Sequence, residues 1–198
     1  MTTFFPFMYD ESGYFSNDKS FILTADDATV SLKYLTALFN SQAAKIWIWY
    51  RCPELLGGAR EIRKIFFEKF PVPDVGAKRE FFETRVDERL AAFATVRKTR
   101  RRFLRRLRED FPDLKATEKL ENFDEATFAA FCNELKKQKI KLTPKARDEW
   151  EDYFDAQLET ARAANARCAE LDAELDDAVA DLYGFDADER AVLRAFTL

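Results

Sequence analysis

The chain has 198 residues, a net charge of −4 and 47% hydrophobic residues, which is enough for one large domain or two small ones. It contains no histidine, which excludes histidine-based catalytic triads and histidine metal sites. The charge is divided unevenly, because the part from Lys145 onward carries 6 Lys and Arg against 15 Asp and Glu, a net of −9, whereas residues 1–144 carry a net of +5. A basic first part and an acidic last part indicate different surfaces or different partners.

The first residues lack the pattern of a signal peptide, and no segment approaches the roughly 20 apolar residues of a membrane span. The three cysteines, Cys52, Cys132 and Cys168, show no paired spacing, and an odd number fits a reducing compartment. We therefore expect a cytoplasmic protein without a membrane partner. Cys52 and Cys168 occupy apolar positions, where we interpret them as inert core thiols.

Aromatic and β-branched residues predict strands within residues 4–24, in "FFPFMY" and "SFILT", with the turn-forming "DESGYFSND" between them. Apolar residues at helical spacing then predict a helix over 29–50. Residues 54–74 are expected to be irregular. Gly57 and Gly58 permit a sharp turn there, "REIRKIFFEKF" predicts a short strand plus one helical turn, and "FPVPDV" predicts an extended exit.

The remainder of the chain predicts helices over 77–109, 124–138 and 144–183, followed by a short helix over 187–196. Thr143 and Pro144 have the character of a helix start, and Gly184 that of a helix end. "DADE" predicts a capping box for the last helix.

These elements predict an α+β protein of two parts. Residues 1–76 would form a small mixed α/β recognition unit, and residues 77–198 a mainly helical, coiled-coil-like tail with long antiparallel helices.

The most strongly basic segment is "TVRKTRRRFLRRLR", residues 95–108, in which eight of fourteen residues are Arg or Lys. Arginine matches phosphate geometry, and several cations on one helical face can displace counterions from nucleic acid. The alternative is a solvated face paired with the acidic tail. The candidate DNA contacts are Arg97, Lys98, Arg100, Arg101, Arg102 and Arg105, with Arg106 and Arg108 beside them.

A second basic group, Arg60, Arg63, Lys64 and Lys69, follows the glycine pair, where a backbone that approaches closely could bring side chains to a DNA groove. The alternative is a surface loop with ordinary charges. A third basic run covers 133–145. "PD" at 112–113 with "ELK" at 134–136 formally matches a PD…ExK nuclease pattern, but both are common words, and helices are expected there rather than the sheet that such chemistry needs.

Other catalytic motifs are missing from the sequence. It contains no phosphate-binding glycine loop, no HExxH, no Asn-Pro-Pro-aromatic tetrad for a flipped base and no Phe-x-Gly-x-Gly for S-adenosylmethionine. We therefore expect no catalytic residue, no metal site and no cofactor of its own in this chain.

Four motifs in order nevertheless resemble a known family. "LKYLTALFNSQAAKIWIWY", the glycine pair, the basic-aromatic segment over 60–70 and "FPVPD" resemble the C-terminal specificity domain of TaqI-type adenine-specific DNA methyltransferases and of fused type II restriction-modification enzymes. The helical end with its Leu-Tyr-Gly turn, "DLYGFDADE", is similar to the tail of the same enzymes. Gln42 and Ala59 depart from the family, which usually has Lys and an aromatic residue there.

The resemblance implies a DNA-binding specificity subunit or C-terminal fragment of a restriction-modification system for DNA methylation. The methyltransferase catalytic domain or subunit, with its S-adenosylmethionine, would be supplied separately. Double-stranded DNA would be a partner. A structural joint would be formed by Gly57, Gly58, Pro71 and Pro73. The loop with Tyr14, Asn17 and Lys19 would reach base edges, although an Asn in a turn is more often only a turn residue. The alternative is a helical protein–protein interaction module without sequence-specific DNA binding.

Overall fold

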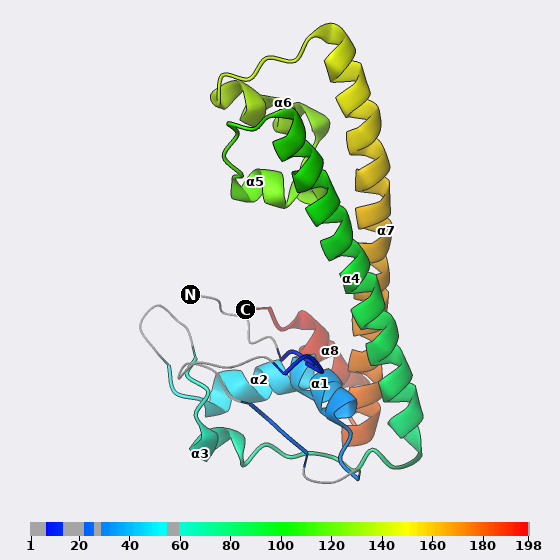
Figure 1. Cartoon of the computed structure of the whole chain (residues 1–198). Helices are drawn as coiled ribbons and strands as arrows, with labels where there is room; N and C mark the ends of the chain where they lie inside the picture. The colour runs from blue at the N-terminus through cyan, green and yellow to red at the C-terminus, as the bar shows by residue number, and fades with distance from the viewer. Residues whose placement is uncertain (1–6, 14–21, 26–28, 55–59, 198) are drawn as a thin grey trace. The chain divides into compact units, whose positions relative to one another are not determined.

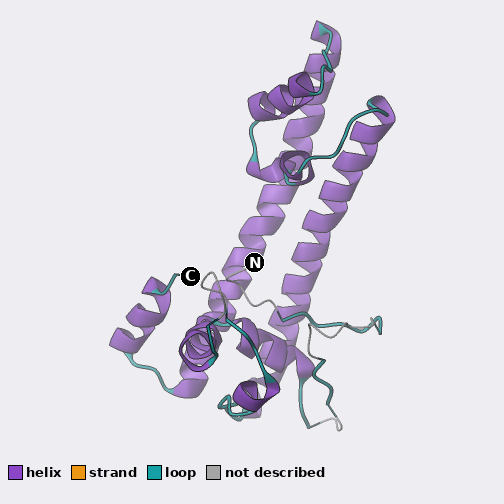
Figure 2. Ribbon diagram, turned by 90° about the vertical axis from the view of Figure 1, so that its left-hand side faces the viewer, coloured by secondary structure: helices purple, strands orange, loops and turns teal. Residues whose placement is uncertain are grey.

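The computed structural model describes residues 7–13, 22–25, 29–54 and 60–197 (Figure 1). Within these ranges all regular elements are helical, and the only β-type contact is an isolated antiparallel bridge between Glu54 and Arg60 (Figure 2). The described part of the chain is therefore all-α, and the predicted α+β class with a mixed α/β unit is wrong. Residues 4–6 and 20–21 of the predicted strands, and part of the predicted turn between them, lie outside the described ranges.

A side chain replaces the expected strand partner of the N-terminal segment. The backbone N–H of Phe7 donates to Asn40 Oδ1 at 3.0 Å, and Asn40 Nδ2 donates to the carbonyl of Phe7 at 2.8 Å. The Phe7 ring lies against Phe39 and Phe67 at 5.1 and 5.4 Å. The amide of a helical asparagine therefore satisfies the backbone of the half-buried Phe7, and no strand forms within residues 7–13.

The chain divides into two compact units, each described by itself below. Unit 1 comprises Met1–Glu88 and Leu171–Leu198, and unit 2 comprises Arg89–Glu170. The long helices α4 (Arg79–Asp110) and α7 (Pro144–Tyr183) contribute to both. The division of the chain at 76/77 into a recognition unit and a tail stays a prediction.

Unit 1 contains α1 (Leu32–Asn40), α2 (Gln42–Arg51), the short α3 (Lys64–Phe67), the 3-10 turn η1 (Gly76–Lys78) and α8 (Ala187–Ala195). The single helix predicted over 29–50 is split at Ser41. Its hydroxyl donates to the Leu38 carbonyl at 2.6 Å and accepts from the Ala44 N–H at 3.2 Å. Ser41 therefore ends one helix and begins the next, a local competition that apolar periodicity does not reveal.

Two tyrosines hold the Pro-x-Pro segment of unit 1. Tyr34 Oη donates to the carbonyl of Pro73 at 2.8 Å, and Tyr183 Oη donates to that of Pro71 at 2.7 Å. Burial raises the pKa of both phenols, that of Tyr34 to about 12. The segment is thus fixed between a residue of α1 and the last residue of α7, while the predicted structural joint stays a prediction.

Unit 2 contains α5 (Glu118–Glu121), the 3-10 turn η2 (Phe123–Glu125), α6 (Phe128–Lys137) and its parts of α4 and α7, which run antiparallel (Figure 1). Its core is aromatic. Phe103 stacks on Phe123 at 3.9 Å and meets Trp150 and Phe154 edge-on at 5.8 and 5.9 Å. These rings fix which side of α4 faces inward, and so which side faces solvent.

The sequence predicted the C-terminal elements of the chain closely. Thr143 Oγ1 accepts from the Ala146 N–H at 3.2 Å at the start of α7. Gly184 has a φ of 70°, and Asp186 and Glu189 form both hydrogen bonds of the capping box that begins α8. None of the helices in the described residues is long and apolar enough to cross a membrane.

Candidate nucleic-acid interface

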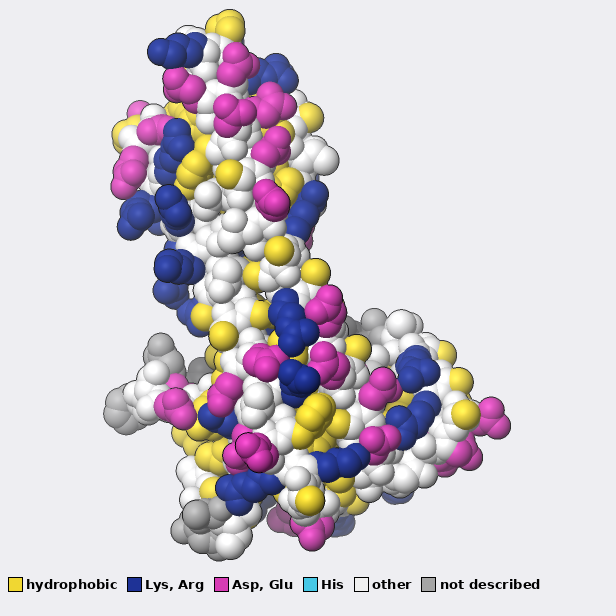
Figure 3. Space-filling view, turned by 90° about the vertical axis from the view of Figure 1, so that its right-hand side faces the viewer, with side chains coloured by type: hydrophobic (Ala, Val, Ile, Leu, Met, Phe, Trp, Pro, Cys, Tyr) yellow, Lys and Arg dark blue, Asp and Glu magenta, His cyan; other side chains and the backbone are white. Residues whose placement is uncertain are grey.

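The inward side of α4 in unit 2 is formed by Val96, Phe103 and Leu107, all of them buried. The opposite side carries six exposed cations, which we name the basic face: Arg97, Lys98, Arg101, Arg102, Arg105 and Arg108. Residues advance about 100° around a helix and 1.5 Å along it, so the six lie within roughly 140° of the circumference and about 17 Å of length. Figure 3 shows basic side chains gathered in this way on the surface of unit 2.

The cations of the basic face have few ion pairs with carboxylates of the described residues. Among the described residues, five of its six cations form no ion pair, and Arg105 only approaches Glu109, at 3.9 Å between exposed side chains. Five of the cations line a shallow hollow of about 460 Å³ with Ala94 at its edge. Unpaired guanidinium groups around an open hollow are available to anions from solution.

Arg100 lies on the same helix but belongs to the interior. Its guanidinium donates to both carboxylate oxygens of Asp124 at 2.7 and 2.9 Å and to Asn122 Oδ1 at 2.7 Å. Asn165 Nδ2 donates to the same carboxylate at 2.8 Å, so the group links α4, η2 and α7. Because its guanidinium is bound to Asp124 inside unit 2, Arg100 is not one of the proposed DNA contacts, in contrast to the prediction from the sequence.

The Asp124 side chain is completely buried. Burial acts to raise the pKa of this carboxyl, but hydrogen bonds from Arg100 and the charge of Arg100 outweigh it and lower the pKa. Asp124 is therefore ionised at neutral pH and holds Arg100 in place. Arg106 is also occupied, because its guanidinium lies over the rings of Tyr153 and Trp150 at 4.1 and 5.1 Å.

The second predicted basic group lies in unit 1 and is partly neutralised. Arg60 pairs with Glu54 at 3.2 Å and stacks over the Trp49 ring at 4.2 Å, with 14% of its side chain exposed. Arg63 pairs with Glu61 at 2.7 Å. Lys64 and Lys69 are exposed. Gly57 and Gly58, like Tyr14, Asn17 and Lys19, lie outside the described residues.

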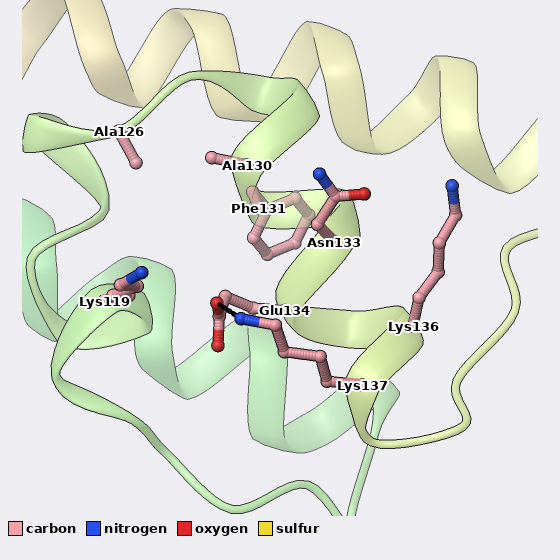
Figure 4. A pocket seen from close by; sticks show the side chains of 8 residues that line it. All are labelled: Lys119, Ala126, Ala130, Phe131, Asn133, Glu134, Lys136 and Lys137. Atoms are coloured by element: carbon pink, nitrogen blue, oxygen red, sulfur yellow. Dashed lines mark hydrogen bonds and ion pairs between the residues drawn. The ribbon is translucent and has the colours of Figure 1, made fainter.

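Two cations of the third basic run, Lys136 and Lys137, line an open hollow of about 590 Å³ on α5 and α6, together with Lys119 and the apolar Ala126, Ala130 and Phe131 (Figure 4). Lys137 Nζ donates to Glu134 at 2.6 Å, and this hydrogen bond lowers the pKa of the Glu134 carboxyl. The "ELK" half of the nuclease-like pattern, residues 134–136, lies on the helix α6, as the sequence predicted. No group of three or more His, Cys, Asp or Glu in the described part of the chain could hold a metal ion.

The sequence reading missed an acidic counterpart on α7. Five exposed carboxylates, which we name the acidic stripe, are Asp148, Glu151, Asp152, Asp155 and Glu159. None of the five forms an ion pair within the described ranges. Their spacing of three and four residues places them on one face of the helix, and this spacing is visible in the sequence.

Fold and site define an all-helical protein, over the residues described, with an unpaired cationic face on one long helix. Residues 76–179 match the family described as Domain of unknown function (DUF8810). Because this segment covers more than half of the chain, the chain belongs to that family. The match includes all of α4, and with it the basic face. No curated protein and no solved structure matches the chain.

Proposed function

We propose that the chain binds double-stranded DNA through the basic face of α4, as a subunit or C-terminal part of an adenine-specific restriction-modification methyltransferase. The observation that carries the DNA-binding proposal is the difference between neighbouring arginines of one helix. Arg100, which points inward, has a buried carboxylate partner, whereas among the outward arginines only Arg105 approaches a carboxylate, the exposed Glu109 at 3.9 Å, within the described residues.

Phosphate is the anion that this surface fits best. Guanidinium groups form paired hydrogen bonds with phosphate oxygens, and each neutralised phosphate releases counterions. If all six cations contact phosphates, the slope of log affinity against log salt is expected to be about −5. Contacts of this kind position a protein on DNA without reading its sequence, so base recognition would come from another part of the chain or system.

The assignment to a methyltransferase system is supported by the resemblance of the joint and tail motifs. Three residues of those motifs have anchoring contacts in unit 1: Asn40 to Phe7, Ser41 between two helices and Tyr183 to Pro71. Methyl transfer, with S-adenosylmethionine, would come from a catalytic domain or subunit elsewhere, and the whole system would act in the cytoplasm.

A helical interaction module is the second candidate. It is favoured by apolar side chains exposed in unit 1, among them Met8, Tyr50 and Ile65, which are 80%, 75% and 58% exposed. A module of this kind would bind a protein partner with little dependence on salt, whereas contact with DNA phosphates weakens steeply as salt rises.

The test measures binding of a labelled random-sequence duplex to the full chain and to two matched variants. Arg101→Gln/Arg105→Gln removes two cations from the basic face, and Lys115→Gln/Lys141→Gln removes two exposed cations elsewhere in unit 2. At about 50 mM salt the first variant is expected to lose at least about tenfold in affinity and the second less than about twofold. Equal losses, or no binding by the unmodified chain, would contradict the proposal.

A further inference from the structure

Unit 2 carries opposite charges on its two long helices. The acidic stripe of α7 spans about 17 Å and roughly 100° of the helix circumference, which nearly matches the length of the basic face on α4. Both surfaces are exposed, and neither is neutralised by ion pairs within the described residues. Two unpaired surfaces of opposite sign in one small unit form a strong electrostatic asymmetry.

The core of unit 2 separates the two surfaces. Phe103 and Leu107 point from α4 into the core, and Trp150 and Phe154 point into it from α7. The basic face and the acidic stripe each lie on the side of their helix that is turned away from these residues. Figure 3 shows many acidic side chains over one side of unit 2, with a few basic ones among them, and several basic side chains along its edge.

From this separation we infer that unit 2 meets a DNA duplex on one side only, through the basic face, and that the acidic stripe keeps the same or a second duplex away from α7. The inference rests on the proposed DNA binding and adds the orientation of the contact. DNA carries one phosphate per roughly 1.7 Å of helix axis when both strands are counted, so a length of about 17 Å of duplex offers about ten phosphates to the six cations. Wrapping around the unit would bring phosphates against unpaired carboxylates, which is electrostatically unfavourable.

The stripe is expected to act over a limited range. The Debye length is about 10 Å at 0.1 M salt and grows as salt falls, so carboxylates beside an approaching duplex repel it strongly only in dilute salt. This repulsion selects the orientation of the encounter more than it changes the final affinity at the basic face.

Photo-crosslinking from two positions tests the orientation. Ala94 borders the hollow of the basic face, and Ala156 is exposed on α7 next to the stripe. Ala94→Cys and Ala156→Cys each receive a benzophenone maleimide, and the three native cysteines are buried, so labelled unmodified protein is the background control. At about 50 mM salt the Ala94→Cys reporter is expected to crosslink a random duplex at least about tenfold more than the Ala156→Cys reporter.

The same two crosslinking reporters are then introduced into two variants that each lack three carboxylates. Asp148→Asn/Asp152→Asn/Asp155→Asn removes three charges of the stripe, while Asp113→Asn/Glu118→Gln/Glu121→Gln removes three exposed charges elsewhere in unit 2. Loss of the stripe is expected to raise DNA crosslinking from Ala156→Cys by about fivefold, with a smaller gain at about 200 mM salt. In the control variant, DNA crosslinking from the Ala156→Cys reporter is expected to stay as weak as in the otherwise unmodified chain.

Three results would overturn the inference. One is equal crosslinking from both reporters in the unmodified background, and another is no gain on removal of the stripe. The third is crosslinking of Ala156→Cys to a second copy of the chain, which would make the stripe a protein contact. Absence of any DNA binding in a parallel anisotropy titration would instead overturn the proposed function, so the two failures are distinguishable.

Discussion

The two units use their basic side chains differently. In unit 1, several cations pair with acids that are distant in the sequence, as Lys33 does with Asp87 at 2.7 Å and Arg85 with Glu174 at 2.7 Å. In unit 2 the basic face has no comparable partner within the described residues. The number of arginines therefore does not distinguish a surface with internal partners from one without them, and the positions of nearby acids do.

Pairs of the first kind connect elements of the fold. Lys78 reaches Asp181 at 2.9 Å, which joins η1 to the end of α7. Exposed pairs contribute only about 0–1 kcal/mol each, so their removal affects unit 1 mildly. The buried Arg100–Asp124 pair of unit 2 differs in energy, because loss of one partner leaves an uncompensated buried charge.

The largest expected effect is a difference in stability between substitutions of two adjacent arginines, Arg100 and Arg101. Arg100→Ala leaves the Asp124 carboxylate unpaired in the interior and is expected to lower the free energy of unfolding by about 3 kcal/mol. Arg101→Ala is expected to change it by less than about 0.5 kcal/mol, because the side chain is exposed and unpaired. Urea denaturation of both variants measures the difference, and similar losses would remove the distinction between inner and outer arginines.

A smaller effect concerns the joint of unit 1. Tyr183→Phe removes the hydrogen bond to the Pro71 carbonyl and is expected to cost about 1 kcal/mol of stability. DNA affinity per folded molecule should stay unchanged, since the basic face belongs to unit 2. Thermal unfolding and duplex binding of the same sample check both statements. A large loss of DNA affinity in a folded Tyr183→Phe protein would show that the joint takes part in binding.

The smallest expected effect concerns a second buried carboxyl. Asp176 accepts the Gln42 N–H at the start of α2 at 2.8 Å, yet burial raises its pKa despite this hydrogen bond and the charge of Lys45. A raised folded pKa means that the stabilisation from this group is complete below the ordinary carboxyl pKa and is lost as pH rises through the folded value.

The free energy of unfolding of Asp176→Asn is therefore expected to equal that of the unmodified chain in acid. At neutral pH it is expected to be higher by up to about 1 kcal/mol. Urea unfolding at a series of pH values gives the difference between the two proteins. Asp124, whose folded pKa is lowered, should show the opposite trend, with its stabilisation lost as pH falls. A difference for Asp176→Asn that does not vary with pH would contradict the assignment.

Several elements could be predicted from local sequence because local physics forms them. The long helix from Pro144, the Gly184 terminus and the Asp186 capping box depend on residues within one or two turns. The break at Ser41 was equally local but was missed, because one serine inside an apolar pattern rarely ends a helix. In the described residues 7–13 the predicted strand is absent for a non-local reason, since Asn40 satisfies the backbone of Phe7 across 33 residues of sequence.

The basic segment is evident in the sequence, but the prediction did not divide its cations into inward and outward ones. Arg100 lies four residues after Val96 and three before Phe103, on the buried stripe, so helical periodicity could have separated it from Arg101. Its partner could not be found in that way, because Asp124 is 24 residues away and is brought near only by the packing of η2 against α4.

The most direct test of the account is the affinity of the full chain for a random-sequence duplex measured from about 50 to about 200 mM salt. An unpaired basic face that contacts five or six phosphates predicts a log–log slope of about −5, reduced by about 0.9 for each of Arg97→Gln, Arg101→Gln and Arg105→Gln. A slope near zero, or a slope that these substitutions leave unchanged, would contradict the claim that this face binds DNA.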